Sequence, residues 1–113
     1  MAQLTVYEKP TCTTCRNLFA LLTERGIDFD TVEYHVTGLS EEELRGLLDK
    51  LGARPHDVLR MREPGAAEAA KLDDDALIAA MVERPELVQR PIVVRGDRAV
   101  LARPVERVLE LLP

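Results

Sequence analysis

The alternation of apolar and polar positions predicts a strand, a helix and a second strand over the first third of the chain. The β-branched and aromatic segment Leu4–Tyr7 is typical of a short buried strand, and Lys9-Pro10 predicts a turn after it. Apolar residues recur at helical spacing over 12–25, and Gly26 is a good stop for that helix. Residues 30–34 predict another strand, so the order favours a parallel pair with a right-handed crossover.

The middle of the chain carries helical signals. Ser40 is followed three positions later by Glu43, which predicts a capping box at a helix start. The helical segments predicted here are 40–51, 55–61, 66–72 and 73–84. The Asp73-Asp74-Asp75 run suits a helix N-terminus rather than a metal site, because carboxylates are favourable at the positive end of the helix dipole. Together these segments form a helical insertion over about 38–88.

The last part of the chain returns to strands. Residues 91–94 are β-branched, Gly96-Asp97 is a turn signal and 98–101 continues the pattern, which predicts an antiparallel hairpin. Pro104 suits the first position of a final helix. We therefore predict a single α/β domain over 1–113. Its mixed sheet is thioredoxin-like (glutaredoxin-like), with the helical insertion between a β-α-β half and a β-β-α half.

Composition narrows the class of protein. The 113 residues suit one domain, and with 46% hydrophobic residues and no Trp the core should be mainly aliphatic. No apolar run of about eighteen residues could cross a membrane, and the chain start lacks signal-peptide features, so we expect a cytoplasmic protein. A net charge of −5 gives no indication of direct nucleic-acid binding. Nothing indicates an oligomer, so a monomer is expected.

Chemistry is concentrated in the only two cysteines, Cys12 and Cys15. A C-x-x-C at a β-to-α transition indicates redox or metal chemistry, but zinc needs about four ligands. His35, expected in a loop, and His56, expected on a short helix, lack ligand spacing, so no metal is predicted. Cys12 would lie at a helix N-terminus, which stabilises a thiolate, and Arg16 adds positive charge. Cys12 is then the exposed nucleophile with Cys15 within disulfide reach. The alternative is that both thiols only pack in the core.

The Arg90-Pro91 pair precedes the third predicted strand. In a thioredoxin-like fold this position belongs to a cis-proline loop that faces the active cysteine, and an X-Pro bond makes the cis form accessible. We therefore predict a cis bond here, with the Arg90 guanidinium directed at Cys12. Without the fold argument, the alternative is a surface arginine before a trans proline.

These segments resemble the arsenate reductase and Spx family over essentially the whole chain. The resemblance rests on several motifs that occur in the right order at the right separations. They are Tyr7-Glu8-Lys9-Pro10-Thr11-Cys12, Arg16-Asn17, Leu59-Arg60 followed by Glu63-Pro64, Arg90-Pro91-Ile92-Val93-Val94, and Arg103-Pro104. A C-x-x-C motif alone would be far less specific.

The resemblance to glutaredoxin-coupled arsenate reductases implies a mechanism. It implies that Cys12 attacks arsenate while arginines, which bind tetrahedral oxyanions bidentately, clamp the substrate. The residues assigned to substrate binding are Arg60, Arg90, Arg103, Arg16 and Thr11. A second thiol then releases arsenite. The resemblance implies that this thiol is the co-substrate glutathione, with no bound cofactor, and that glutaredoxin or thioredoxin clears the remaining disulfide.

Two positions depart from the family pattern. Glu8 stands where well-studied reductases have His, and a nearby carboxylate would raise the pKa of the cysteine. Cys15 is often absent from those enzymes and resembles the pair of the Spx-type regulators, although it could equally resolve the Cys12 adduct. Two alternatives therefore stay open: a thiol-disulfide oxidoreductase of the same fold, and a non-enzymatic Spx-like redox regulator that binds RNA polymerase. Convergence of Arg60 and Arg103 on Cys12 would favour an oxyanion site.

Overall fold

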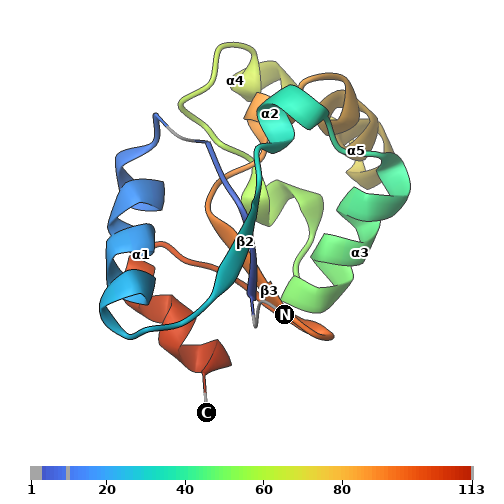
Figure 1. Cartoon of the computed structure of the whole chain (residues 1–113). Coiled ribbons are helices and arrows are strands. Elements are labelled where there is room, and N and C mark those ends of the chain that lie inside the picture. Colours follow the sequence, from blue (N-terminus) through green and yellow to red (C-terminus); the bar gives the residue numbers. More distant parts are fainter. Residues whose placement is uncertain (1–3, 10, 113) are drawn as a thin grey trace.

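The computed structural model, which describes residues 4–9 and 11–112, is built around a four-stranded mixed sheet (Figure 1). The strands are β1 (Leu4–Tyr7), β2 (Phe29–Val32), β3 (Ile92–Arg95) and β4 (Arg98–Leu101). Their order is β2-β1-β3-β4, with β1 and β2 parallel and β3 antiparallel to β1 and β4. The predicted parallel pair, the hairpin and the thioredoxin-like α/β class are confirmed. The predicted turn includes Pro10, which lies outside the described residues.

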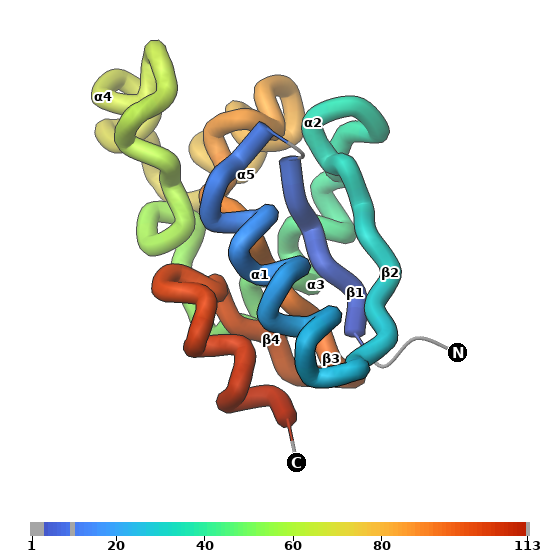
Figure 2. Tube along the Cα trace, turned by 60° about the vertical axis from the view of Figure 1, so that its left-hand side comes forward, coloured from blue at the N-terminus to red at the C-terminus, as the bar shows by residue number. Residues whose placement is uncertain are grey.

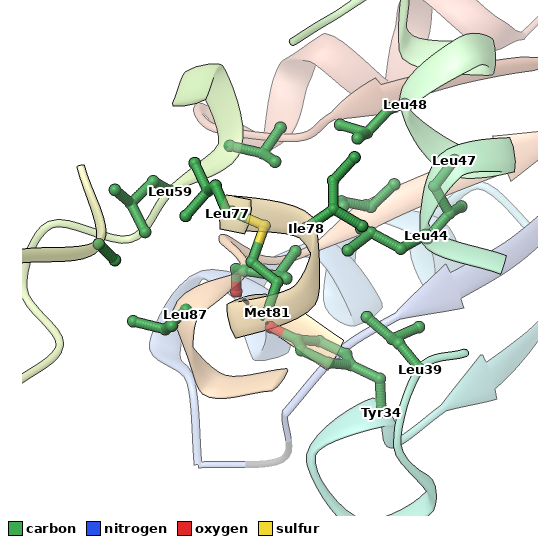
Figure 3. Packing of buried hydrophobic residues seen from close by; sticks show 14 of the residues in the cluster. Tyr34, Leu39, Leu44, Leu47, Leu48, Leu59, Leu77, Ile78, Met81 and Leu87 are labelled. Carbon is green, nitrogen blue, oxygen red and sulfur yellow. Dashed lines mark hydrogen bonds between the residues drawn. The ribbon is translucent and has the colours of Figure 1, made fainter. Parts of the chain in front are cut away.

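Side chains of alternate strand residues lie on opposite faces of the sheet and belong to two hydrophobic clusters, one on each face. On one face, α1 (Thr13–Glu24) and the 3-10 helix η3 (Val105–Leu111) cover buried strand residues such as Val6. On the other face, α3 (Glu41–Leu51) and α5 (Asp74–Glu83) close over the larger cluster, shown in Figure 3. Figure 1 shows the two layers, with α1 and the red η3 on one side and α3 and α5 on the other.

Shorter helices complete the segment between β2 and β3. They are α2 (Tyr34–Thr37), α4 (Ala66–Ala69) and the 3-10 helices η1 (Pro55–Val58) and η2 (Pro85–Leu87). Helices were predicted over 55–61 and 66–72, and both are found but are shorter. Buried residues of the insertion therefore come from the short helices as well as from α3 and α5.

The second predicted strand is wrong at its C-terminal end. Strand β2 ends at Val32, and Tyr34 opens α2 instead of continuing the strand. The cause is a tertiary contact, because the buried Tyr34 hydroxyl donates a 2.6 Å hydrogen bond to the Val88 carbonyl oxygen (Figure 3). The same turn places His35 in a helix rather than in the predicted loop.

The helix starts follow local capping signals. Asp73 Oδ1 accepts a 2.8 Å hydrogen bond from Ala76 N–H, and Ser40 Oγ accepts one of 3.0 Å from Glu43 N–H. The predicted capping box at Ser40 is only half formed, because Glu43 Oε2 accepts a 2.9 Å hydrogen bond from Tyr7 OH. That bond ties α3 to β1. Burial together with Glu43 raises the pKa of Tyr7 to about 12.

The final helix differs from the prediction in type. It is a 3-10 helix, and Pro104 is its N-cap residue rather than its first helical residue. Its buried residues, Val108 and Leu111, are three positions apart, a spacing that matches three residues per turn. Among the described residues, no helix is both long enough and apolar enough to cross a lipid bilayer.

Candidate active site

Helix α1 begins at the end of the sheet where β1 and β2 finish. In Figures 1 and 2 its first turn lies at the same end of the molecule as α2 and α4, away from η3. Cys12 is the N-cap residue, with an extended backbone (φ −81°, ψ 122°), and its N–H donates a 2.9 Å hydrogen bond to the Lys9 carbonyl oxygen. Cys12 therefore lies beside the free N–H groups of the first helical turn, as the sequence predicts.

Several groups favour the ionised form of the Cys12 thiol. Burial opposes ionisation, but the Cys15 N–H and thiol, the Arg90 charge and the Thr14 N–H outweigh it, so the pKa of Cys12 is lowered. The Cys12 side chain accepts no capping hydrogen bond from the first turn of α1, so these N–H groups favour its thiolate form without forming one. The first turn of α1 holds no acidic residue that would oppose them. Together these groups favour the thiolate form of Cys12.

Cys15 differs from Cys12 in burial and in charge state. Both thiols are free, but Cys15 is fully buried whereas Cys12 is half-buried, which confirms the predicted difference in exposure. Burial, Cys12 and Glu8 raise the pKa of Cys15 to about 12, although the Lys9 backbone favours its thiolate. The pair therefore combines a half-buried thiol of lowered pKa with a protonated thiol one helical turn behind it.

Arg90 is a buried arginine at the site, with only 4% of its surface exposed. The bond from Arg90 to Pro91 is cis, as predicted. Burial lowers the pKa of the Arg90 guanidinium, but the Tyr34 and Cys12 side chains outweigh burial and raise it. Its Nη1 donates a 3.4 Å hydrogen bond to the Glu86 carbonyl oxygen, whereas its buried Nε has no partner among the described residues. A buried guanidinium with a spare donor suits an anion.

Arg60 reaches the site through a pairing of two segments that are distant in sequence. Leu59 and Val88 form an isolated antiparallel bridge, and Arg60 N–H donates a 2.7 Å hydrogen bond to the Leu87 carbonyl oxygen. Beside it, Glu63 Oε1 lies 3.4 Å from Arg60 Nε. The pairing fixes the backbone of Arg60 next to the segment that leads to Arg90.

Arg103 follows β4 and is held against the cis-proline segment. Its Nη1 donates a 2.9 Å hydrogen bond to the Arg90 carbonyl oxygen. The neighbouring Ala102 N–H donates a 2.9 Å hydrogen bond to the Pro91 carbonyl oxygen. The residues after β4 and those before β3 therefore place two of the predicted arginines side by side.

These side chains surround an open cavity of about 270 Å³. Its lining consists of Thr11, Cys12, Thr13, Thr14, Arg60, Arg62, Arg90 and Arg103. The fold thus brings Thr11 and the three predicted clamp arginines together around Cys12, which is the arrangement expected of an oxyanion site. Arg16 is exposed on α1 and does not line the cavity. Sequence reasoning missed Arg62 and two threonines, and the proximity of Arg62 to Arg60 was the one available signal.

Comparison with known proteins agrees with this geometry. The model of the ArsC family matches residues 7–111, which include every residue of the cavity lining. The chain belongs to the ArsC family. The predicted resemblance is thereby confirmed.

Relatives of this ArsC protein include several arsenate reductases. The solved structure of the arsenate reductase from Vibrio cholerae is similar with a TM-score of 0.91, at 39% identity, over 99% of this chain and 100% of that one. An arsenate reductase of Escherichia coli is 37% identical over 118 residues, which cover 100% of this chain and 83% of that protein. One from Neisseria meningitidis serogroup B is 32% identical over 117 residues, 99% of this chain and 100% of that protein.

Glu8 of this ArsC protein is buried and acts electrostatically on the inner cysteine, Cys15. It is 3% exposed, and its Oε2 has no hydrogen-bond partner among the described residues. Burial and the charge of Glu33 raise the pKa of Glu8. Glu8 contributes to the raised pKa of Cys15 but is not among the groups that set the pKa of Cys12. The pKa of Cys12 is therefore lowered even with a carboxylate at this unusual position.

The remaining polar residues singled out from the sequence lie elsewhere. His56 is part of η1, as expected, with Nε2 2.7 Å from the Leu72 carbonyl oxygen and Nδ1 3.3 Å from Asp74 Oδ1. Asp73 caps α5. Over residues 4–9 and 11–112, no group of three or more His, Cys, Asp or Glu side chains is placed to hold a metal ion. The site therefore combines a thiol of lowered pKa with arginines.

Proposed function

We propose that this ArsC protein is an arsenate reductase whose nucleophile is Cys12. The observation that carries the proposal is the cavity itself, whose lining within the described part of the chain combines a thiol of lowered pKa with four arginines and no carboxylate. The arsenate reductases among its relatives supply the identity of the oxyanion. A tetrahedral anion is suited to such a site, because arginine forks bind it bidentately and stay charged.

The first step forms a bond between sulfur and arsenic. The Cys12 thiolate attacks the arsenic of dihydrogen arsenate, a hydroxyl group takes up one proton from solvent and leaves as water, and a thioester of arsenate with one negative charge remains. Arg60, Arg90 and Arg103 hold the oxygens on which charge accumulates. Because Arg90 is buried, its charge acts in a medium of low dielectric and is therefore weakly screened.

The second step reduces arsenic. A second thiol attacks the Cys12 sulfur, the sulfur–arsenic bond breaks with its electron pair left on arsenic, and As(V) becomes As(III), released as arsenite. The two sulfurs are oxidised to a disulfide. In our proposal the attacking thiol is glutathione, and glutaredoxin or thioredoxin then reduces the mixed disulfide. We place the reaction in the cytoplasm, where these thiols are kept reduced.

A coupled assay tests the nucleophile. NADPH oxidation is followed with arsenate, glutathione, glutaredoxin and glutathione reductase, for the wild type, Cys12→Ser and the matched variant Cys15→Ser. We expect Cys12→Ser to lose all arsenate-dependent oxidation, because a serine hydroxyl is not ionised at neutral pH. Retained turnover in Cys12→Ser would sink the mechanism. If glutathione resolves the adduct, Cys15→Ser keeps most of the activity.

The buried Cys15 favours one second candidate, a thiol-disulfide oxidoreductase. In that case Cys15 attacks the Cys12 adduct, which forms a Cys12–Cys15 disulfide, and thioredoxin then reduces this disulfide. Cys15→Ser would then be as inactive as Cys12→Ser with every reductant. Turnover of a small disulfide substrate without any turnover of arsenate would select this candidate over arsenate reduction.

A further inference from the structure

The cavity contains one more positive charge than the proposed clamp uses. The chain as a whole has a net charge of −5, yet of the residues that the structure describes, four arginines and no carboxylate line this cavity. The fourth arginine, Arg62, differs from the other three because it is exposed, whereas Arg90 is buried and Arg60 and Arg103 are half-buried. No ion pair found among the described residues involves Arg62. Its guanidinium therefore stands on the solvent side of the clamp without a carboxylate.

The second step of the proposed reaction creates a need for this charge. The Cys12–arsenate adduct is negative, and glutathione, with two carboxylates and one ammonium group, is also an anion. Two like charges must therefore approach to bonding distance at the Cys12 sulfur. A cation at the mouth of the cavity reduces this repulsion and can bind a carboxylate of the incoming thiol. The clamp arginines cannot do this while they hold the oxyanion.

We infer that Arg62 is a specificity residue that selects thiols bearing carboxylates, such as glutathione, by binding their carboxylate while their sulfur attacks Cys12. The inference rests on the proposed function, because it names the class of co-substrate for the same site. The exposed Thr13 at the first helical position lines the same cavity and offers a hydroxyl for a further contact with this thiol.

Steady-state kinetics with two thiols test this role. Glutathione is compared with the uncharged 2-mercaptoethanol for the wild type, Arg62→Ala, Arg62→Lys and the control Arg25→Ala. Arg25 is exposed at the far end of α1, so its variant removes the same charge away from the cavity. We expect Arg62→Ala to raise the KM for glutathione about three- to sixfold, the effect of one exposed ion pair. The KM for 2-mercaptoethanol and for arsenate should stay unchanged, and Arg62→Lys should recover part of the loss.

Three outcomes overturn the inference. An equal rise in KM for both thiols would mean that Arg62 supports the fold of the site rather than the carboxylate. A rise in the KM for arsenate alone would place Arg62 in the oxyanion clamp. An unchanged KM for glutathione, or the same loss in Arg25→Ala, would remove Arg62 from thiol selection altogether.

An arsenate-free measurement separates this inference from the proposed function. In a Cys15→Ser background, the Cys12 thiolate attacks oxidised glutathione, which breaks the disulfide, forms a mixed disulfide and releases one glutathione thiolate. The rate, followed by mass spectrometry, is compared with that for the uncharged 2-hydroxyethyl disulfide. We expect Arg62→Ala to slow only the first reaction, by about three- to sixfold. If the wild type reduces no arsenate but this preference holds, the proposed function fails and Arg62 keeps its role. If arsenate is reduced and the preference is absent, only the inference fails.

Discussion

Two groups of arginines in this molecule have different surroundings. At the start of α5, Arg45 Nη2 lies 3.0 Å from Asp75 Oδ1, and Arg54 Nη2 lies 3.0 Å from Asp74 Oδ1. Four arginines line the cavity around Cys12, and Glu63 is the one carboxylate that forms an ion pair with any of them among the described residues. Both arginines of the first group are paired with aspartates, whereas three of the four cavity arginines form no ion pair among the described residues.

The difference follows from where the carboxylates stand. Helix α5 has acidic residues at its cap and in its first turn, and these suit the dipole and pair with arginines across the surface. Helix α1 has no acidic residue in its first turn, and a cysteine and threonines take those positions. The positive end of α1 and the arginines are both left for an anion. Among the described residues, the candidate site is distinguished by a cavity lining that contains four arginines and no carboxylate, with Glu63 as the one ion-pair partner of these arginines.

Removing a clamp arginine should have the largest effect. Arg103→Ala is expected to raise the KM for arsenate about 10- to 100-fold, because a charge-assisted hydrogen bond to the anion is lost. Steady-state kinetics at saturating glutathione measure the change. Arg54→Ala, which removes an exposed arginine already paired with Asp74, is the control and should leave the KM unchanged. Similar effects of the two variants would contradict the comparison.

Adding a carboxylate to the cavity should give its arginines an ion-pair partner, as Arg45 and Arg54 have at the start of α5. Thr13→Asp places an acid beside the arginines and is expected to lower kcat/KM for arsenate about tenfold through pairing and repulsion. Thr13→Asn, of the same size but uncharged, should retain most of the activity. Because an acid at a helix N-terminus stabilises the helix, the Tm of Thr13→Asp should not fall. Equal activity in the two variants would show that nearby carboxylates do not matter.

The charge of Arg90 should also be visible in the titration of Cys12. Since the pKa of Cys12 is lowered, its thiolate fraction and its alkylation by iodoacetamide should stay high below the ordinary thiol range. Arg90→Gln removes a positive charge, so the midpoint of the alkylation rate against pH should move upward. At pH 7 the reaction should slow several-fold. The measurement uses a Cys15→Ser background, and an unmoved midpoint would mean that Arg90 does not act on the thiolate.

Substitution of Glu8, the buried carboxylate near Cys15, gives the smallest predicted effect, and the effect is on stability. Its pKa is raised in the folded protein, so the stability that its protonated form contributes is present below about pH 4.5 and is lost as pH rises through the folded pKa. Glu8→Gln, which stays neutral, should therefore be more stable than the wild type at pH 8 by about 1 kcal/mol. The difference should shrink at pH 4.5. Urea unfolding at both pH values measures it, and a constant difference would contradict a raised pKa.

Local signals predicted much of the scaffold but not its tertiary exceptions. The strand β1, the helix start at Cys12 and the hairpin of β3 and β4 depend on neighbours within a few residues, so periodicity and turn residues were sufficient. Tyr34 and Glu43 were predicted less well, because each uses its side chain on a distant element. Local preference was overridden there by a contact that no short window of sequence contains.

The sequence by itself determined a thiol at a helix N-terminus with a second cysteine one turn behind it, because both features are properties of a few consecutive residues. The family resemblance indicated which arginines to examine. Only the tertiary structure decided that Arg60, Arg90 and Arg103 line one cavity. Their proximity depends on the β-bridge between Leu59 and Val88 and on the hydrogen bond from the Arg103 guanidinium to the Arg90 carbonyl oxygen. The tertiary structure also determined that Glu8 acts electrostatically on Cys15 and that Arg62 lines the cavity. Such proximities arise from chain reversals over tens of residues, which hydrophobic periodicity does not encode.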